Sequence, residues 1–212
     1  MLKVYIRTMR GSIFAKEHSG AFYWDTVTGE IITDFGNVLK RSKGLSMLIS
    51  LTPAQAKILT ELDTWGYSDV VDLEAETNIS VAQIKRTLST LQKRSLVTLE
   101  RSSDKRIHSY KRMVELKYPK KFDKIKVEMP EIIRGALTES VITSKFKLKD
   151  LKKLISTLKP GTRIISCEEV FYPYYMVNIT GKYGPRTVIL DSVTGTADKT
   201  LTEFLHIKNM EK

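Results

Sequence analysis

The residues of this sequence whose types and spacing could do chemistry are polar and basic side chains between positions 80 and 112. Apolar residues recur there at helical spacing, and they mark one buried side of a helix at Val81, Ile84, Leu88 and Leu91. The opposite side of that helix carries hydrogen-bond donors and acceptors at Gln83, Arg86, Ser89, Thr90 and Lys93. Side chains of these types bind the base edges and phosphates of double-stranded DNA.

The positive charge of the chain is concentrated in the same region. Residues 80–120 hold 11 Lys or Arg and 3 Asp or Glu, so they supply +8 of the chain's net charge of +11. The preceding residues 51–79 hold one Lys and six acids. A basic segment of this kind indicates a polyanionic partner, and nucleic acid is the commonest such partner.

The helices that must position these residues can be predicted from caps and periodicity. Thr52 is expected to cap a helix over residues 52–64, because Thr accepts a hydrogen bond from the first turn. A short second helix is expected over residues 68–76. Ser80 and Gln83 match the capping box S-x-x-Q and predict the start of the third helix.

A basic hairpin is predicted directly after the third helix. Residues 96–101 and 106–112 alternate between apolar and polar side chains, and a short polar turn separates the two segments. Basic side chains cluster near its tip, where they could contact phosphate or the minor groove. They are Arg101, Lys105 and Arg106.

In this order of three helices and two strands, residues 51–112 resemble the winged helix-turn-helix domain of archaeal and bacterial regulators of the MarR, TrmB and ArsR kind. Residues 51–59 (LTPAQAKIL) are similar to the first helix of that family, and residues 80–88 (SVAQIKRTL) to its recognition helix. Residues 91–97 (LQKRSLV) are similar to the passage into its wing. The resemblance implies that the polar side of the third helix faces the major groove, although some winged domains bind proteins instead.

A second pattern is an internal repeat at an offset of 166 residues. Ser12–Gly29 aligns without a gap with Asn178–Gly195, and both copies end in Asp-(Thr/Ser)-Val-Thr-Gly. Asp25 and Asp191 are expected to accept hydrogen bonds from the amides of their own turns, and the closing Gly to take positive φ. The motif resembles the D-x-x-T-G turn of PepSY-like β-hairpin modules.

These patterns predict an α+β fold in which a central winged helix-turn-helix is flanked by N- and C-terminal β-hairpin repeats. The two repeats could pair as one β platform from which the basic domain emerges as an insertion. The expected regions are an N-terminal β region, a winged domain, a basic connector with a helical pair over 130–144 and 148–158, and a C-terminal β region. Their bounds are 1–50, 51–116, 117–160 and 161–212.

The composition of the chain and the motifs that it lacks exclude several classes of function. No apolar run approaches the roughly 18 residues needed to span a bilayer, so we expect a cytoplasmic protein without a membrane partner. Cys167 is the single cysteine and the three histidines match no metal-ligand spacing, so no metal and no cofactor are expected. No phosphate-binding or nucleotide-binding glycine motif and no G-x-S-x-G is present.

The predicted function is double-stranded DNA binding by a non-enzymatic transcriptional regulator, with a homodimer left open. One alternative is a DNA-processing factor, either a replication accessory or a metal-dependent nuclease. Asp25, Glu30 and Asp191 would supply the carboxylates of the nuclease, beside Lys16 and Lys182. The other alternative is a winged-helix protein-interaction module, and an exposed apolar patch over the third helix would favour it.

Overall fold

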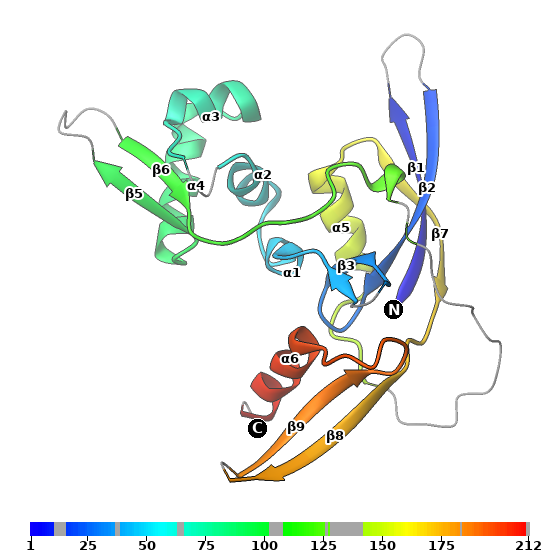
Figure 1. Cartoon of the computed structure of the whole chain (residues 1–212). Coiled ribbons are helices and arrows are strands. Elements are labelled where there is room, and N and C mark those ends of the chain that lie inside the picture. The colour runs from blue at the N-terminus through cyan, green and yellow to red at the C-terminus, as the bar shows by residue number, and fades with distance from the viewer. Residues whose placement is uncertain are drawn as a thin grey trace. The chain divides into compact units, whose positions relative to one another are not determined.

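The computed structural model forms two units, which are described separately (Figure 1). The first unit comprises residues 1–42, 119–152 and 161–212, and the second comprises residues 43–118 and 153–160. Both helices and antiparallel strands are present, so the fold is α+β, as predicted. The structure describes residues 1–10, 16–36, 39–62, 66–101, 108–125, 127, 142–182 and 184–210.

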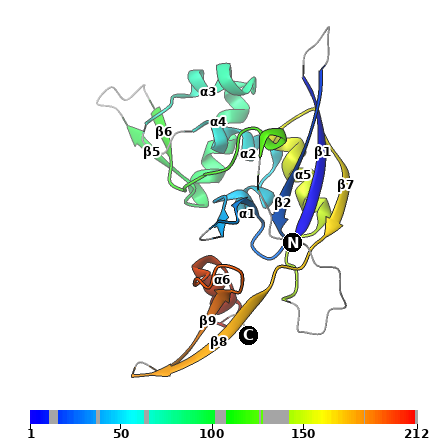
Figure 2. The same ribbon diagram turned by 45° about the vertical axis from the view of Figure 1, so that its right-hand side comes forward.

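The first unit is built on a five-stranded antiparallel sheet in the order β4-β3-β2-β1-β7 (Figure 2). The long pair β1 and β2 runs from Leu2 opposite Trp24 to Arg10 opposite Lys16. Alternate side chains of β1 are buried, so one face of the sheet is covered along this strand, and a second buried cluster that includes Tyr23 and Ile32 lies on the other face at β2 and β3. The strands are β1 (Leu2–Arg10), β2 (Lys16–Asp25), β3 (Glu30–Asp34), β4 (Lys40–Arg41) and β7 (Thr162–Glu169).

Aromatic side chains fill the covered side of this sheet. Phe22 and Trp24 on β2 are fully buried. The ring of Phe22 lies 5.8 Å from that of Phe122 in the short helix η1 (Phe122–Lys124), and Trp24 lies 6.4 Å from Phe146. Large rings of this kind supply much of the apolar area that a core of this size needs.

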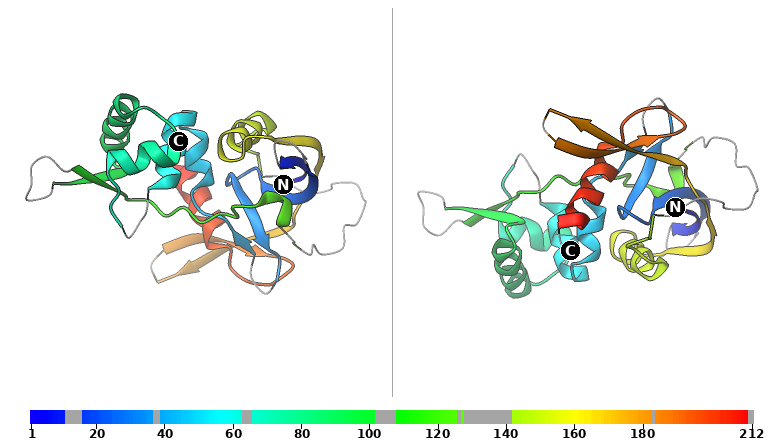
Figure 3. Two further views of the ribbon diagram at one scale, coloured as in Figure 1. Left: turned by 90° about the horizontal axis from the view of Figure 1, so that it is seen from above. Right: turned by 90° about the horizontal axis from the view of Figure 1, so that it is seen from below.

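The second sheet of this unit is a hairpin of β8 (Tyr174–Gly181) and β9 (Gly184–Asp191), followed by α6 (Lys199–Met210). Figure 3 shows α6 beside β9. The amide of Ile189 donates to the Thr202 hydroxyl at 3.0 Å, and Ile189 and Leu201 are both buried. Neither α6 nor the two-residue strand β4 was expected from the sequence.

The two copies of the repeat therefore lie in different sheets, and the expectation of one shared β platform is wrong. The first copy contributes β2 to the five-stranded sheet, whereas the second contributes β9 to the separate hairpin. The reason is that both edges of β2 are occupied, one by β1 and the other by β3. No edge beside the first copy is left for β8 or β9.

The second unit contains helices followed by a two-stranded sheet, β5–β6 (Figure 1). Its two ends meet, because Lys43 and Lys117 exchange backbone hydrogen bonds of 2.7 and 3.0 Å. Gly44 has φ +85°, and a Cβ there would lie 2.7 Å from the Glu115 carbonyl, so this approach requires glycine. The elements are α1 (Leu45–Ile49), α2 (Pro53–Glu61), α3 (Val70–Thr77), α4 (Val81–Lys93), β5 (Val97–Arg101) and β6 (His108–Arg112).

Helices α2 and α3 begin with side-chain caps at the residues where the sequence predicts a helix start, whereas the capping bond predicted for α4 is not formed. Thr52 and Gln55 form a reciprocal capping box on α2, and Asp69 caps α3 by accepting from two amides. The capping box predicted for Ser80 and Gln83 is wrong, because the Ser80 side chain makes no capping bond. The carboxylate of Glu74 in α3 accepts from the Val81 amide at 3.2 Å instead.

Helix α5 (Leu148–Leu158) has the predicted bounds, and the boundary between the two units falls inside it. The other predicted helix, over residues 130–144, lies outside the described residues up to position 141. No helix in the described part of the chain is long and apolar enough to cross a membrane.

Candidate nucleic-acid interface

Helix α4 has one face buried against its own unit and one face open. Ile84, Leu88 and Leu91 are fully buried, and α4 contacts both α2 and α3. Val81, the fourth residue of the predicted stripe, is half-buried, and Thr87 completes the buried face. The buried residues fix the rotation of α4 about its axis, and so determine which side chains point to solvent.

The open face of α4 contains every helix residue that the sequence singled out. At 3.6 residues per turn, Arg86, Ser89 and Lys93 lie opposite the buried stripe, and Gln83 and Thr90 flank them. All five are exposed. We call this set the outward face of α4.

The chemistry of the outward face is that of a cationic hydrogen-bonding surface. Arg86 and Lys93 carry positive charge, and Gln83 offers both a donor and an acceptor. The hydroxyl of Thr90 donates to the Arg86 carbonyl at 3.1 Å, so Thr90 presents its methyl group and an acceptor rather than a free donor. Helix α4 contains no acid, and exposed Lys85, which the sequence reasoning passed over, adds a third cation at its margin.

Two nearby arginines have structural roles. Arg94 follows α4 and donates to the Ser50 hydroxyl at 3.0 Å, and Arg112 on β6 donates to the Leu59 carbonyl at 3.2 Å. Each guanidinium therefore binds another element of its own unit. The many basic residues of this region are thus not equivalent, and Arg86 and Lys93 on the outward face of α4 are among those exposed to solvent.

The predicted hairpin forms as β5–β6, and the described residues stop at Arg101 and resume at His108. Val97 and Tyr110 are buried on one side of it, and Arg101 pairs with His108 at the last described position of the ladder. Lys105 and Arg106, both predicted to contact DNA, fall in residues 102–107, outside the described residues. For Arg101 only its place in β5 is described, so the three hairpin residues stay predictions.

A third strand position completes this small sheet. Ser68 and Tyr110 exchange backbone hydrogen bonds of 2.9 and 2.8 Å, so the residue just before α3 pairs with β6. Lys111 lies 5.5 Å from the Tyr67 ring centroid, within the range of a cation–π contact. The hairpin is therefore tied to the start of α3 as well as to α4.

The repeated turns of the first unit match their predicted structure in both copies. One carboxylate oxygen of Asp25 accepts from the amides of Val27 and Thr28 at 2.9 and 3.4 Å. The equivalent oxygen of Asp191 accepts from the second and third amides of its own turn at 2.9 and 3.1 Å. Gly29 and Gly195 both have positive φ, at 76° and 69°. The turns are explained by local hydrogen bonding without catalysis.

Asp25 has a further role that the sequence did not indicate. Its second carboxylate oxygen accepts from Nε of Arg41 at 2.8 Å, Nη1 of Arg41 lies 2.7 Å from Asp198, and Nη2 donates to the Tyr174 hydroxyl at 2.8 Å. The side chains of Arg41, Asp25 and Asp198 are only 4–5% exposed. This buried group, which we call the Arg41 cluster, joins the five-stranded sheet to the β8–β9 hairpin.

Burial and charge act in opposite directions on the groups of the Arg41 cluster. Burial lowers the pKa of the Arg41 guanidinium, but Tyr174, Asp25 and Asp198 outweigh it and leave that pKa above its ordinary value. Burial raises the pKa of Tyr174, and Arg41 opposes this only in part. The cluster therefore holds one cation between two acids and a neutral phenol.

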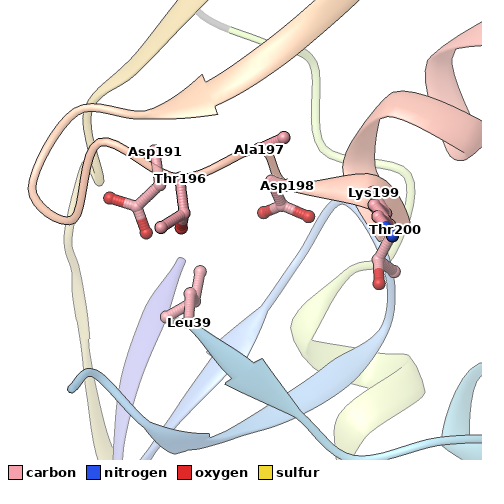
Figure 4. A pocket seen from close by; sticks show the side chains of 7 residues that line it. All are labelled: Leu39, Asp191, Thr196, Ala197, Asp198, Lys199 and Thr200. Carbon is pink, nitrogen blue, oxygen red and sulfur yellow. The ribbon is translucent and has the colours of Figure 1, made fainter. Parts of the chain in front are cut away.

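A hollow lies beside this cluster, and two acids line it. It measures about 320 Å³ and lies between the turn after β9 and the start of α6 (Figure 4). Its two acids already have partners, because Asp191 accepts from its turn and from Tyr172, while Asp198 caps α6 and pairs with Arg41. Among the described residues, no three Asp, Glu, His or Cys side chains are grouped to hold a metal ion.

Comparison with protein-family models, curated proteins and solved structures finds no match for this chain.

Proposed function

We propose that this protein binds double-stranded DNA through the outward face of α4 and the β5–β6 hairpin, as a transcriptional regulator. The observation that carries the proposal is the outward face itself. Five polar or basic side chains are exposed together on a helix whose opposite side is fully buried. A helix held in this way can enter the major groove without losing its packing.

The order of elements in the second unit supports assigning it to the winged helix-turn-helix class. Helices α2, α3 and α4 contact one another, and the link from α3 to α4 is the short segment 78–80. Asn78 has φ 53°, a left-handed conformation that ends α3 sharply. The β5–β6 hairpin and the Ser68–Tyr110 pairing then supply a small sheet in the position of a wing.

In the proposed complex, phosphate contacts position the helix and base contacts give specificity. Lys93 and the hairpin cations neutralise phosphates and release condensed counterions. Arg86 can form two hydrogen bonds to guanine in the major groove, and Gln83 can do the same with adenine. Arg86 lies between Gln83 and Ser89 on the helix, and the short side chain of Ser89 lets the helix backbone approach the bases.

The outward face also argues against a protein-interaction module. Such a module needs an exposed apolar patch over this helix. The large exposed apolar side chains described in the second unit are Tyr67, Val71 and Met113, and none of them belongs to α4, all of which is described. An apolar protein groove would also leave Arg86 and Lys93 without suitable partners.

The proposal is tested by placing a negative charge on the outward face. We expect Ser89→Glu to weaken binding of random-sequence duplex DNA at least about tenfold, because like charges opposed at an interface cost several kcal/mol. The measurement is fluorescence anisotropy with the full chain and a labelled duplex. Sequences selected by the wild-type protein would then define the site.

Ser156→Glu is the matched control, since it makes the same exchange on the exposed surface of another helix, α5, and gives the same net charge. We expect it to bind DNA like the wild type. Equal affinities of the two variants would show that α4 does not meet DNA.

A further inference from the structure

The β8–β9 hairpin is a two-stranded sheet in which the outer edge of β8 is open. β9 is bridged on its outer side at Leu190 by Ala197, and the Asp198 amide donates to the Ile189 carbonyl at 2.8 Å. No strand pairs with the outer side of β8 in the described residues. Two-stranded sheets are only marginally stable in water and gain from a third strand.

β8 also lacks the features by which edge strands avoid pairing with other chains. Edges are ordinarily protected by charged residues or proline. The other outer strands have these, with Arg163 and Glu168 on β7 and Lys40 on β4, while β9 carries Pro185 and Arg186. Residues 170–181, which include all of β8, contain no charged residue.

One face of the hairpin is uncovered and is apolar except at Arg186, which lies opposite Ile179. Residues opposite each other in an antiparallel pair share a face, so Tyr175 lies beside Leu190 and Val177 beside Val188. Tyr175 is 64% exposed and Ile179 on the same face is 36% exposed. Helix α6 covers the other face at Ile189, so it leaves this one open.

We propose that β8 is the interface of a homodimer, in which two copies pair antiparallel through their β8 edges about a twofold axis. A register centred on Val177 places that residue opposite its own copy and Tyr175 opposite Ile179. The four strands then form one continuous sheet with a shared apolar face. A second copy suits this edge because β8 is uncharged, so two chains of net charge +11 can pair there without opposing cations.

Dimerisation through β8 does not depend on DNA binding, and it can be tested without DNA. We expect sedimentation equilibrium of the full chain to show a dimer, and Val177→Lys to raise its dissociation constant at least about tenfold by opposing two ammonium groups across the axis. Val188→Lys is the matched control, because it puts the same charge on the same face one strand away. At about 4.8 Å between strands, its two copies lie about 14 Å apart.

A cysteine at the axis provides a second readout that keeps the native packing. In a Cys167→Ser background, Val177→Cys should form an intermolecular disulfide on mild oxidation, because directly opposed Cα atoms lie about 4.5–5.5 Å apart, within the range that a disulfide spans. Val188→Cys should not. A wild-type chain that stays monomeric would overturn the proposal, and so would a dimer in which Val177→Cys fails to cross-link. Equal weakening by both lysine variants would overturn edge pairing in favour of packing between faces.

Discussion

Arg86 occupies the position from which a side chain on α4 can reach furthest from the protein, because it lies opposite the buried stripe. If it reads a base pair, Arg86→Ala should reduce the preference for that pair by about 1–3 kcal/mol while binding of other sequences falls less. Competition between the selected site and its single-base variants measures this. Arg186→Ala, an exposed arginine on β9, is the control and should leave the preference unchanged.

The two turn aspartates hold the same position in the repeated motif but contribute differently to stability, because their surroundings differ. Asp191 accepts from two turn amides and Tyr172, so Asp191→Ala should cost roughly 1–3 kcal/mol in the free energy of unfolding. Asp25 also pairs with buried Arg41, and removing one partner of a buried ion pair costs about 3–5 kcal/mol.

Denaturant unfolding of Asp25→Ala and Asp191→Ala tests this order directly. Asp25→Ala should be the less stable variant, and both should bind DNA like the wild type, since neither residue belongs to the second unit. Equal losses of stability would mean that the Arg41 cluster contributes little. A loss of DNA affinity in folded Asp25→Ala would contradict the structural role given to this residue.

At the scale of elements, the segment that leads into β8 makes the first unit sensitive to alkaline pH. Burial and the bond to Asp191 raise the pKa of Tyr172, and burial raises that of Tyr174, both above the ordinary value of 10.0. The folded state therefore keeps these protons longer than the unfolded state does. The stabilisation that these protons provide is expected to be fully present below about pH 10 and to be lost progressively as the pH rises above it.

Urea unfolding between pH 9 and pH 11 checks this expectation. Tyr172→Phe is the informative variant, because it removes one titrating phenol and should reduce the slope above pH 10. An unchanged slope in Tyr172→Phe, or a wild-type stability that rises with pH in this range, would contradict the assignment.

Sequence patterns predicted the elements whose signal is local and missed those that depend on distant partners. The apolar stripe of α4 and the bounds of α5 follow from helical periodicity within one segment. Strand β4 has two residues and exists only because β3 pairs with it. Ser80 is the N-cap of α4, as predicted, but its side chain makes no capping bond, and Glu74 from the preceding helix accepts from the Val81 amide.

At the scale of the molecule, the turns of the repeat depend on local contacts, whereas their placement in the fold depends on distant ones. Each Asp-(Thr/Ser)-Val-Thr-Gly turn closes through bonds two or three residues apart, so both copies were predictable. Which sheet each copy joins depends on strands outside the repeated turn, since β2 pairs with β1 and β3 whereas β9 pairs with β8. The Arg41 cluster likewise joins Asp25, Tyr174 and Asp198, whose spacing in the sequence has no period.

The distribution of charge along the chain connects the elements to the proposed function. Residues 80–120 carry a net charge of +8 after a segment of net charge −5 at 51–79. The acidic segment and residues 80–118 of the basic segment lie inside the second unit, whose ends meet at Lys43 and Lys117. A unit with this uneven charge is oriented by the field of a polyanion, which favours the approach of its basic segment.

The most direct test of DNA binding is the dependence of affinity on salt. We expect the full chain to bind a random-sequence duplex, with log K falling linearly with log salt at a slope near −4 to −5, as release of counterions from about five phosphates requires. Anisotropy titrations between about 50 and 200 mM KCl measure that slope. An affinity that does not change over this range, or no binding at the lowest salt, would contradict the account.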